Sequence, residues 1–500
     1  MKIAYLLGAA ILLPILSGLF LLLFKDRIKN RNLKCIGIFL VMAVTSALVV
    51  MLMLENDCEL VFWKLTNLLE IRMRLDDLAR LFAGMTVAAW TLGGVFSFEY
   101  MKHEDHEDRY YGFYLIVMGI LIALDHAGNL ITLYLFFEMM TLTSLPMVLH
   151  NLSHEAVMAG LKYLFYSVAG AFMALFGIFY LYANGVGHVF YEGGYLLRLD
   201  SYTGTWGMTL FVLMLMIVGF GTKAGMFPMH GWLPTAHPVA PAPASAVLSG
   251  IITKSGVLAI VRVVFYTVGA DAIRDTWVQY AWMILALITI FMGSMMAYKE
   301  RLLKKRLAYS TVSQVSYILF GLSTLSVDGV IGGLSHFVFH SVVKNCLFLA
   351  AGVIIYKTGK KTVQELGGLG KEMPVTMWCF TLVSITLVGI PPTSGFVSKW
   401  YLAMGSLKTG MGFYSWFGPV VLLLSAMLTA GYLLPVSIRA FFPGKEYDYE
   451  KQKKREPNLL MLIPMLLFTA AAVLFGIFPG MFMAFLQNLA AGMMQAGGGI

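Results

Sequence analysis

The chain has 500 residues, of which 59% are hydrophobic and only 13% are charged, and its mean hydropathy is +0.77. Soluble domains carry about a quarter charged residues, so this composition excludes a soluble protein and indicates an integral membrane protein. The formal net charge of +9 is then first a sign of topology rather than of nucleic-acid binding. The four cysteines stand far apart, which argues against the paired-cysteine patterns of zinc, iron–sulfur and haem sites.

Apolar runs of about 20 residues predict membrane-spanning helices. The first run is too long for a signal peptide and has only Lys2 before it, so we expect a retained first helix. The predicted fold class is an all-α polytopic membrane protein. Fourteen segments are predicted, with approximate bounds 3–24, 34–54, 79–98, 110–126, 128–149, 160–184, 208–228, 240–266, 276–297, 307–325, 329–356, 374–405, 415–441 and 458–486.

Basic residues alternate between rich and poor loops along the chain. Of the 36 Lys and Arg residues, 22 fall in loops of one parity, 8 in loops of the other and 6 within helices. Because basic residues mark the inner side of a membrane, we expect the rich loops inside and both termini on the outer face. The rich set includes Lys25, Lys29, Lys445 and Lys451.

Two of the predicted spanning segments contain helix-breaking residues. The seventh runs through Gly225 to Pro228 into a proline-rich stretch, and the twelfth is interrupted between Gly389 and Gly395. Proline removes a backbone donor and clashes with the preceding turn, so each helix must open there. Opened backbone at membrane depth survives only beside protein or water. Matching breaks in the two halves of the chain favour a transporter of inverted repeats with its site at mid-membrane.

Ionisable side chains recur at interior depth in at least five predicted helices. Each costs about 2.5–3.5 kcal/mol at a helix centre, so each needs a reason. A purely structural explanation is that each group is hydrogen-bonded to a neighbour, or is a lysine whose ammonium group reaches the membrane interface. The number of such groups argues against this explanation. We therefore predict a proton relay through a hydrated interior. Its candidate members are Glu138, Lys223, Lys254, His336, His340, Lys344 and Lys399.

Glu138 and Lys223 are the predicted switching pair of this relay, because a nearby carboxylate stabilises a charged lysine. His336, His340 and Lys344 stand at i, i+4 and i+8, which places them on one stripe of a helix. The two histidines have the spacing of a metal-ligand pair, but no Glu follows His336 directly, so a relay is favoured over metal or haem.

Other charged groups allow two interpretations. Asp76, Asp77 and Asp125 stand near predicted helix ends, where they are either interfacial groups or part of a route for proton or cation uptake. The charged run 102–109 is better explained as a solvated loop than as a surface cation site.

Three stretches resemble a known family of membrane subunits: Leu133–Leu145 around Glu138, Gly221–Pro234 with the residues up to Pro243, and Gly389–Phe396. They are similar to the antiporter-like subunits of respiratory complex I, of energy-converting hydrogenases and of Mrp-type multisubunit cation/proton antiporters. The resemblance covers nearly the whole chain. It implies fourteen helices with two inverted five-helix repeats, helices four to eight and nine to thirteen. The implied divisions are 1–109, 110–266 for the first repeat, 276–441 for the second, and 442–500.

The resemblance also implies roles for single residues. Glu138 and Lys223 match the fifth-helix glutamate and seventh-helix lysine, Lys254 the connecting lysine, His336 the central histidine, and Lys399 the residue at the exit half-channel. The accessory members of the relay are His340, Lys344, Asp125 and His230. The family's redox centres belong to other subunits, so we expect no cofactor and no metal in this chain.

Chain length and Lys399 fit the D-type subunit of an Mrp antiporter best, because one complex I subunit type has glutamate at that place. The expected function is proton translocation in a multisubunit Na⁺ or K⁺/proton antiporter of a prokaryotic cell membrane, with other membrane subunits as partners and no nucleic acid. Three alternatives stay open: a proton-pumping subunit of a complex I-like NADH:quinone oxidoreductase or hydrogenase, a non-conducting scaffold, and a self-sufficient transporter of organic solutes.

Overall fold

The protein is built almost entirely of helices, as predicted. The computed structural model describes residues 2–24, 27, 30–64, 66, 69–200, 202–444 and 453–495. Lys25, Lys29, Lys445 and Lys451 of the predicted basic loops lie outside these residues. The helices are α1 (Lys2–Leu23), α2 (Arg31–Met53), α3 (Asp77–Tyr100), α4 (Glu107–Asp125), α5 (Leu130–Val148), α6 (His154–Ala183), α7 (Trp206–Ala224), α8 (Leu233–Val239), α9 (Ala242–Val247), α10 (Thr253–Val263), α11 (Ala270–Ile273), α12 (Trp277–Lys299), α13 (Leu303–Ser323), α14 (Val327–Thr358), α15 (Leu369–Glu372), α16 (Pro374–Val388), α17 (Ser394–Leu407), α18 (Phe413–Phe441), α19 (Leu459–Ile477) and α20 (Gly480–Met494).

Every one of the fourteen predicted segments coincides with helix in the structure. Among the described residues, eleven helical spans are long and apolar enough to cross a membrane by length and composition. The three segments beyond these eleven correspond to α4, to α13 and to the short pair α16 and α17. Fourteen crossings therefore stay a prediction, whereas the helical, multiply spanning architecture is confirmed.

Both predicted breaks are present, and each begins at a glycine with positive φ. α7 ends before Gly225 (φ +78°) and the chain resumes as α8, while α16 ends before Gly389 (φ +90°) and resumes as α17. Glycine adopts this left-handed conformation without the steric cost that a Cβ brings, so it ends a helix readily.

Two further interruptions were not predicted. The segment predicted at 240–266 contains π-helical turns at Leu248–Ile252 and Val264–Val268, on either side of α10. The prediction of one continuous helix over 458–486 was wrong, because the segment divides into α19 and α20 at Phe478 and Pro479. Proline disfavours helical backbone at the residue before it, and Phe478, which precedes Pro479, has φ −123° and ψ 61°.

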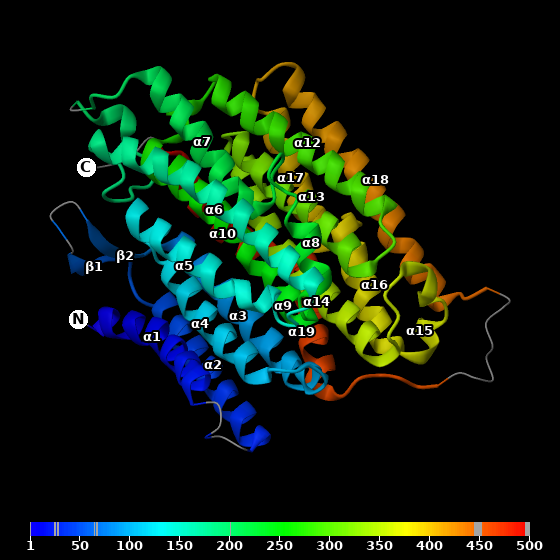
Figure 1. Cartoon of the computed structure of the whole chain (residues 1–500). Helices are drawn as coiled ribbons and strands as arrows, with labels where there is room; N and C mark the ends of the chain where they lie inside the picture. The colour runs from blue at the N-terminus through cyan, green and yellow to red at the C-terminus, as the bar shows by residue number, and fades with distance from the viewer. Residues whose placement is uncertain are drawn as a thin grey trace.

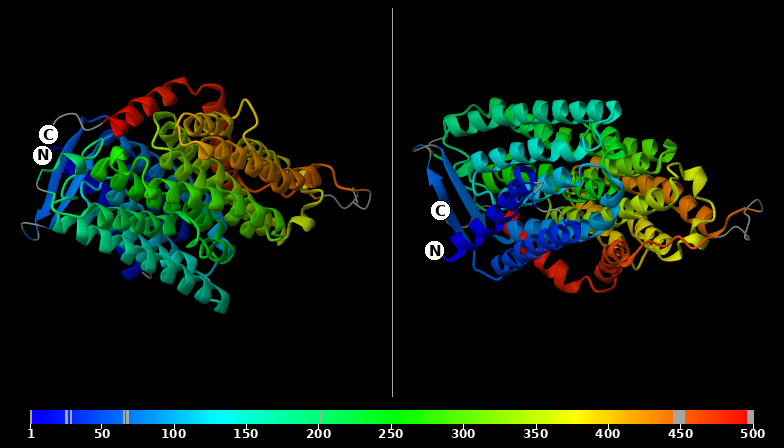
Figure 2. Two further views of the ribbon diagram at one scale, coloured as in Figure 1. Left: turned by 90° about the horizontal axis from the view of Figure 1, so that it is seen from above. Right: turned by 60° about the horizontal axis from the view of Figure 1, so that its bottom comes forward.

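The connection 55–78 between α2 and α3 forms an antiparallel hairpin. Its strands are β1 (Cys58–Lys64) and β2 (Glu70–Leu75), with a register irregularity between Val61 and Trp63. Figures 1 and 2 show this hairpin at the end of the molecule where α1 begins and α20 ends, with α15 at the opposite end. The two ends of the described chain therefore lie on one side.

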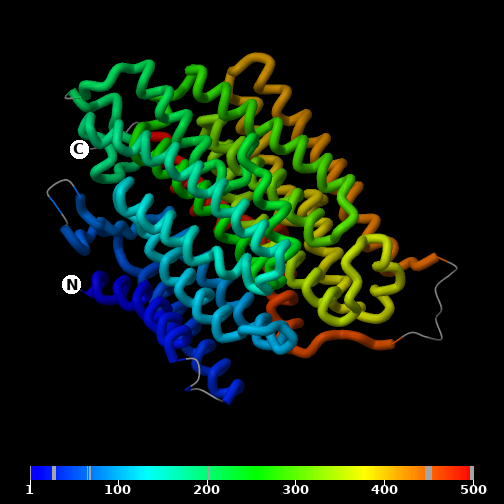
Figure 3. The backbone as a smooth tube through the Cα atoms, viewed as in Figure 1, coloured from blue at the N-terminus to red at the C-terminus, as the bar shows by residue number. Residues whose placement is uncertain are grey.

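The centre of the bundle is formed by α14 and by the span Ala242–Val268. Of the 18-residue windows in these spans, 94% and 100% of residues are buried, far more than in α1 or α2. α14 packs against α13, α16, α17 and α19. Residues 453–458 lead along the end of the bundle to α19, which also lies against α3 (Figure 3). The two spans that carry Lys254, His336, His340 and Lys344 are thus the most enclosed in the protein.

Candidate functional site: a buried series of lysines and histidines

Lys223 lies in the last turn of α7 with its ammonium group enclosed by hydroxyl groups. The Nζ atom donates to Thr141 Oγ1 at 2.9 Å, to the Tyr163 hydroxyl at 2.7 Å and to Ser167 Oγ at 3.2 Å. It also lies 4.3 Å from the centre of the Tyr163 ring, a cation–π distance. All three hydrogen-bond partners are neutral, so the site solvates the ammonium without neutralising its charge.

Close packing of α6 against α7 sets this geometry. A Cβ on Gly170 would lie 2.5 Å from the Gly219 carbonyl oxygen, so only the absence of a side chain lets the two helices meet here. The Trp232 indole donates to the Thr222 carbonyl at 2.8 Å and holds the segment after the break against the end of α7. Tyr163 and Ser167 on α6 are thereby brought to Lys223.

Glu138, the predicted partner of Lys223, lies nearby on α5 but does not contact it directly. Thr141, which binds the Lys223 ammonium, follows Glu138 by three residues and so lies on the next turn of the same helix face. Among the described residues no ion pair within 4 Å joins Glu138 to Lys223, and the buried Glu138 Oε1 has no hydrogen-bond partner. The structure therefore places the two residues in one region of the bundle without an ion pair between them.

Lys254 is completely buried at the start of α10, directly after the first π-helical turn. Its ammonium donates to the carbonyl of Ser249, within that turn. The Ser249 hydroxyl in turn forms a 2.7 Å hydrogen bond with Thr311 Oγ1 of α13. π-helical turns are frequent at functional sites, and this one places Lys254 where the first half of the chain meets the second.

The imidazole of His336 connects three helices in the centre of the bundle. Its Nδ1 lies 3.0 Å from Ser398 Oγ of α17, and its Nε2 lies 3.1 Å from Gln314 Oε1 of α13. The ring stacks on Tyr317 with 5.2 Å between centroids. A ring with a hydrogen-bonding neighbour at each nitrogen is suited to accept a proton on one side and donate it on the other.

His340 and Lys344 continue the predicted stripe along α14. The His340 ring stacks on His336 at 5.8 Å and is buried, and within the described part of the chain neither of its nitrogens has a hydrogen-bond partner. The Lys344 ammonium donates to the Leu307 carbonyl at 3.0 Å. Burying a polar group without a hydrogen-bond partner costs folding free energy. His340 is therefore a stronger relay candidate than the accessory role predicted from the sequence.

Lys399 bridges the break between α16 and α17. Its ammonium donates to the carbonyls of Leu387 and Val388, each at 2.7 Å, which are the last residues of α16. These carbonyls carry the partial negative charge of a helix C-terminus. Lys399 is partly exposed and lies 5.4 Å from the ring of Tyr317, so it connects the broken helix to the surroundings of His336.

The structure brings neither Asp125 nor His230 into contact with the other candidates. Asp125 is buried at the end of α4 and accepts a 2.8 Å hydrogen bond from Thr86. His230 lies in the turn between α7 and α8, stacked on Phe227 at 6.0 Å between ring centroids, and no residue of the described chain bonds its Nδ1. Their accessory roles stay predictions.

Asp76 lies in a buried ion pair that was not predicted from the sequence. It is fully buried and receives the Arg262 guanidinium through two hydrogen bonds of 2.5 and 2.9 Å, together with the Arg74 Nε at 2.8 Å. Its other acceptor capacity caps α3 through the Ala79 amide. The available signal was Arg262 within an apolar run, because an arginine at that depth requires a partner.

A polar cavity of about 340 Å³ opens where the two halves of the chain meet. Its lining includes Glu104, Glu155, Lys304 and Lys361. The Lys304 ammonium donates to the carbonyls of Pro238, at 3.3 Å, and Ala240. Burial raises the pKa of the Glu104 carboxyl above its ordinary value.

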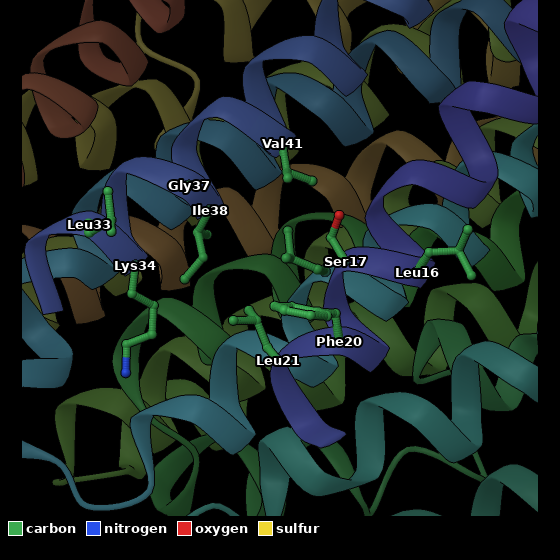
Figure 4. Close-up of a pocket in the computed structure, with 10 residues that line it drawn as sticks. Leu16, Ser17, Phe20, Leu21, Leu33, Lys34, Gly37, Ile38 and Val41 are labelled. Atoms are coloured by element: carbon green, nitrogen blue, oxygen red, sulfur yellow. The ribbon is translucent and has the colours of Figure 1, made fainter. Parts of the chain in front are cut away.

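An apolar crevice of about 360 Å³ between α1 and α2 has a different character. Figure 4 shows its lining, with Lys34 at one end. The Lys34 ammonium is paired with Asp108, so its charge is neutralised, and the lining includes no residue of the buried series. In the described part of the chain, no group of three or more His, Cys, Asp or Glu residues is arranged to hold a metal ion.

Comparison with known proteins agrees with this architecture. Residues 127–435 match the family "NADH:quinone oxidoreductase/Mrp antiporter, TM". The chain is 32% identical to the N-type subunit of the NADH-quinone oxidoreductase of Desulforudis audaxviator over 385 residues, 74% of each chain. It is 29% identical to the D-type subunit of the Na⁺/H⁺ antiporter of Bacillus subtilis over 483 residues, 93% of this chain and 92% of that one. A chain of the Mrp complex from Dietzia has the same fold, with a TM-score of 0.84, 20% identity, and 99% and 98% of the two chains covered.

Proposed function

This chain belongs to the NADH:quinone oxidoreductase/Mrp antiporter transmembrane family, and on that premise we propose that it is the D-type subunit of a multisubunit cation/proton antiporter. It is a multi-pass membrane protein. In the proposal, the chain carries protons across a prokaryotic cell membrane in exchange for Na⁺ or K⁺. It does so in a complex with other membrane subunits, and both of its termini lie on the outer face. The similarity to a D-type antiporter subunit along 93% of the chain supports this choice.

The observation that carries the proposal is the environment of Lys223. A buried ammonium held by three neutral hydroxyls can lose its proton without leaving an unpaired carboxylate at the same contact. Glu138, one turn away from Thr141, supplies the charge that stabilises the protonated lysine. A change in the charge of Glu138 therefore changes how firmly Lys223 holds its proton.

The remaining candidates form the onward route. Lys254 stands at the junction of the proposed repeats 110–266 and 276–441, and the His336–His340 pair follows on α14. Lys399, at the end of the α16 dipole, takes or releases the proton at the far break. Each residue in this route acts by binding or releasing one proton, and the chain itself requires no electron transfer.

Glu138→Gln tests whether the chain conducts protons or only docks its partners. Glutamine keeps the shape but not the charge, so we expect proton flux through the assembled complex to fall by about 10²-fold, the lower end of the effect of a positioned proton-transfer group. The measurement is pH-dye quenching in vesicles that contain the complex. Glu365→Gln is the matched control, because Glu365 is exposed and glutamine also completes its capping box. Unchanged flux in Glu138→Gln favours the scaffold.

The second candidate function is a proton-pumping subunit of a complex I-like oxidoreductase, favoured by the 32% identity to an NADH-quinone oxidoreductase subunit. The two functions differ in what drives the protons. If the antiporter proposal holds, adding Na⁺ or K⁺ to vesicles with an imposed pH gradient dissipates the gradient without any electron donor. A requirement for NADH and quinone would instead favour the second function.

A further inference from the structure

Three serine hydroxyls converge in the buried space between α12, α13 and α18. Ser294 Oγ lies 2.8 Å from Ser313 Oγ and 2.6 Å from Ser425 Oγ, and the latter two are 3.3 Å apart. All three side chains are completely buried. Each hydroxyl can donate one hydrogen bond and accept others, and Ser313 Oγ also donates to the Ile290 carbonyl at 2.9 Å.

A second group of hydroxyls lies one turn further along α18 and α13. The Tyr432 hydroxyl donates to Ser310 Oγ at 2.7 Å and lies 3.3 Å from Thr429 Oγ1. The Tyr432 carbonyl accepts a 2.8 Å hydrogen bond from Arg306, which also binds the carbonyl of Glu300. The Tyr432 backbone thus ties α18 to the start of α13, and the hydroxyl group itself ends at Ser310, two turns into α13.

The first group reaches the buried series through Tyr317. The Tyr317 hydroxyl donates to the Leu422 carbonyl at 3.1 Å, and Leu422 precedes Ser425 by one turn of α18. The same tyrosine stacks on His336 and lies beneath Lys399. Tyr317 thus lies between the serine group and the relay residues, and Ser310 points the series toward the start of α13.

We propose that these side chains form a proton branch between the relay at His336 and Lys399 and the inner end of α13. This hydroxyl file consists of Tyr317, Ser294, Ser313, Ser425, Thr429, Tyr432 and Ser310. It rests on the proposed function and adds a second route to it. Each step breaks one O–H bond and forms another, so every hydroxyl regains its proton. The single helical turn between the two groups is a rise of about 5.4 Å, and the proposal requires one hydrogen-bonded water to bridge it.

A purely structural role would make the same hydroxyls ties between helices. The two roles differ in their consequences, because a tie affects stability and a route affects flux. Tyr432→Phe and Ser425→Ala each remove one oxygen and keep most of the packing. If the file conducts, proton flux per assembled complex falls several-fold in both variants while abundance and thermal stability stay near those of the unmodified complex. Ser425→Thr, which keeps a hydroxyl, restores flux.

Two controls match these variants outside the file. Tyr114→Phe removes a buried hydroxyl that donates to the Trp90 carbonyl at 2.6 Å, and Ser437→Ala removes one on α18 itself that accepts from Thr381 at 2.9 Å. We expect both to keep full flux. Unchanged flux in Tyr432→Phe and Ser425→Ala, or an equal fall in the controls, overturns the proposal. Lys223→Ala in the same vesicles separates the outcomes: full flux there defeats the proposed function, whereas loss there with unaffected file variants defeats the file alone.

Discussion

Lys223→Ala is expected to abolish proton transport while the complex still assembles. The substitution removes the ammonium group on which the switch with Glu138 depends. The fold should tolerate the loss, because Tyr163 and Thr141 keep other hydrogen bonds, to Ser144 at 2.7 Å and to the Phe137 carbonyl at 3.1 Å. Removing a buried charge also removes its desolvation cost. Flux in vesicles and the amount of intact complex are the two measurements.

Lys299→Ala provides the control for this variant. Lys299 ends α12 and is exposed, so its removal changes the net charge equally without touching the buried series. Flux close to that of the unmodified complex is expected there. Full transport by Lys223→Ala would show that the proton does not pass through this lysine and would defeat the proposed mechanism.

The largest effect on stability is expected from Asp76→Asn. Asparagine can still cap α3, but it leaves the buried Arg262 guanidinium without its counter-charge, a change that typically costs about 3–5 kcal/mol. The guanidinium is completely buried, with the rings of Tyr266 and Phe190 at 4.5 and 5.4 Å, so the native fold does not expose it to water. We expect a strong loss of folded protein, measured as membrane abundance and as the thermal midpoint of the purified complex.

The neighbouring Asp77→Asn is the matched control. Asp77 pairs with Arg80 at 2.8 Å, but its side chain is 42% exposed, and exposed pairs contribute about 0–1 kcal/mol. The double variant Asp76→Asn with Arg262→Met removes both buried charges and should recover much of the stability. Equal thermal midpoints for the two single variants would contradict the assigned role of the Asp76–Arg262 pair.

The spanning helices and their breaks were predictable because they depend on local properties of the chain. Hydrocarbon thickness fixes the length of an apolar run, and glycine with proline opens a helix wherever it occurs. The alignment of His336, His340 and Lys344 follows from helical periodicity alone. The division at Pro479 escaped prediction because the flanking apolar residues continue without interruption.

The amino-acid sequence by itself determined a multiply spanning helical protein, two broken helices and the helices on which titratable groups lie. Only the tertiary structure decided what those groups contact. Asp76 and Arg262 are 186 residues apart in the sequence. Lys223 of α7 contacts Thr141 of α5 and Tyr163 of α6. The hydroxyl file joins α12, α13 and α18 through serines that no local sequence pattern distinguishes from other serines. Such partners depend on which helix faces meet, and packing between distant segments decides this rather than any local pattern.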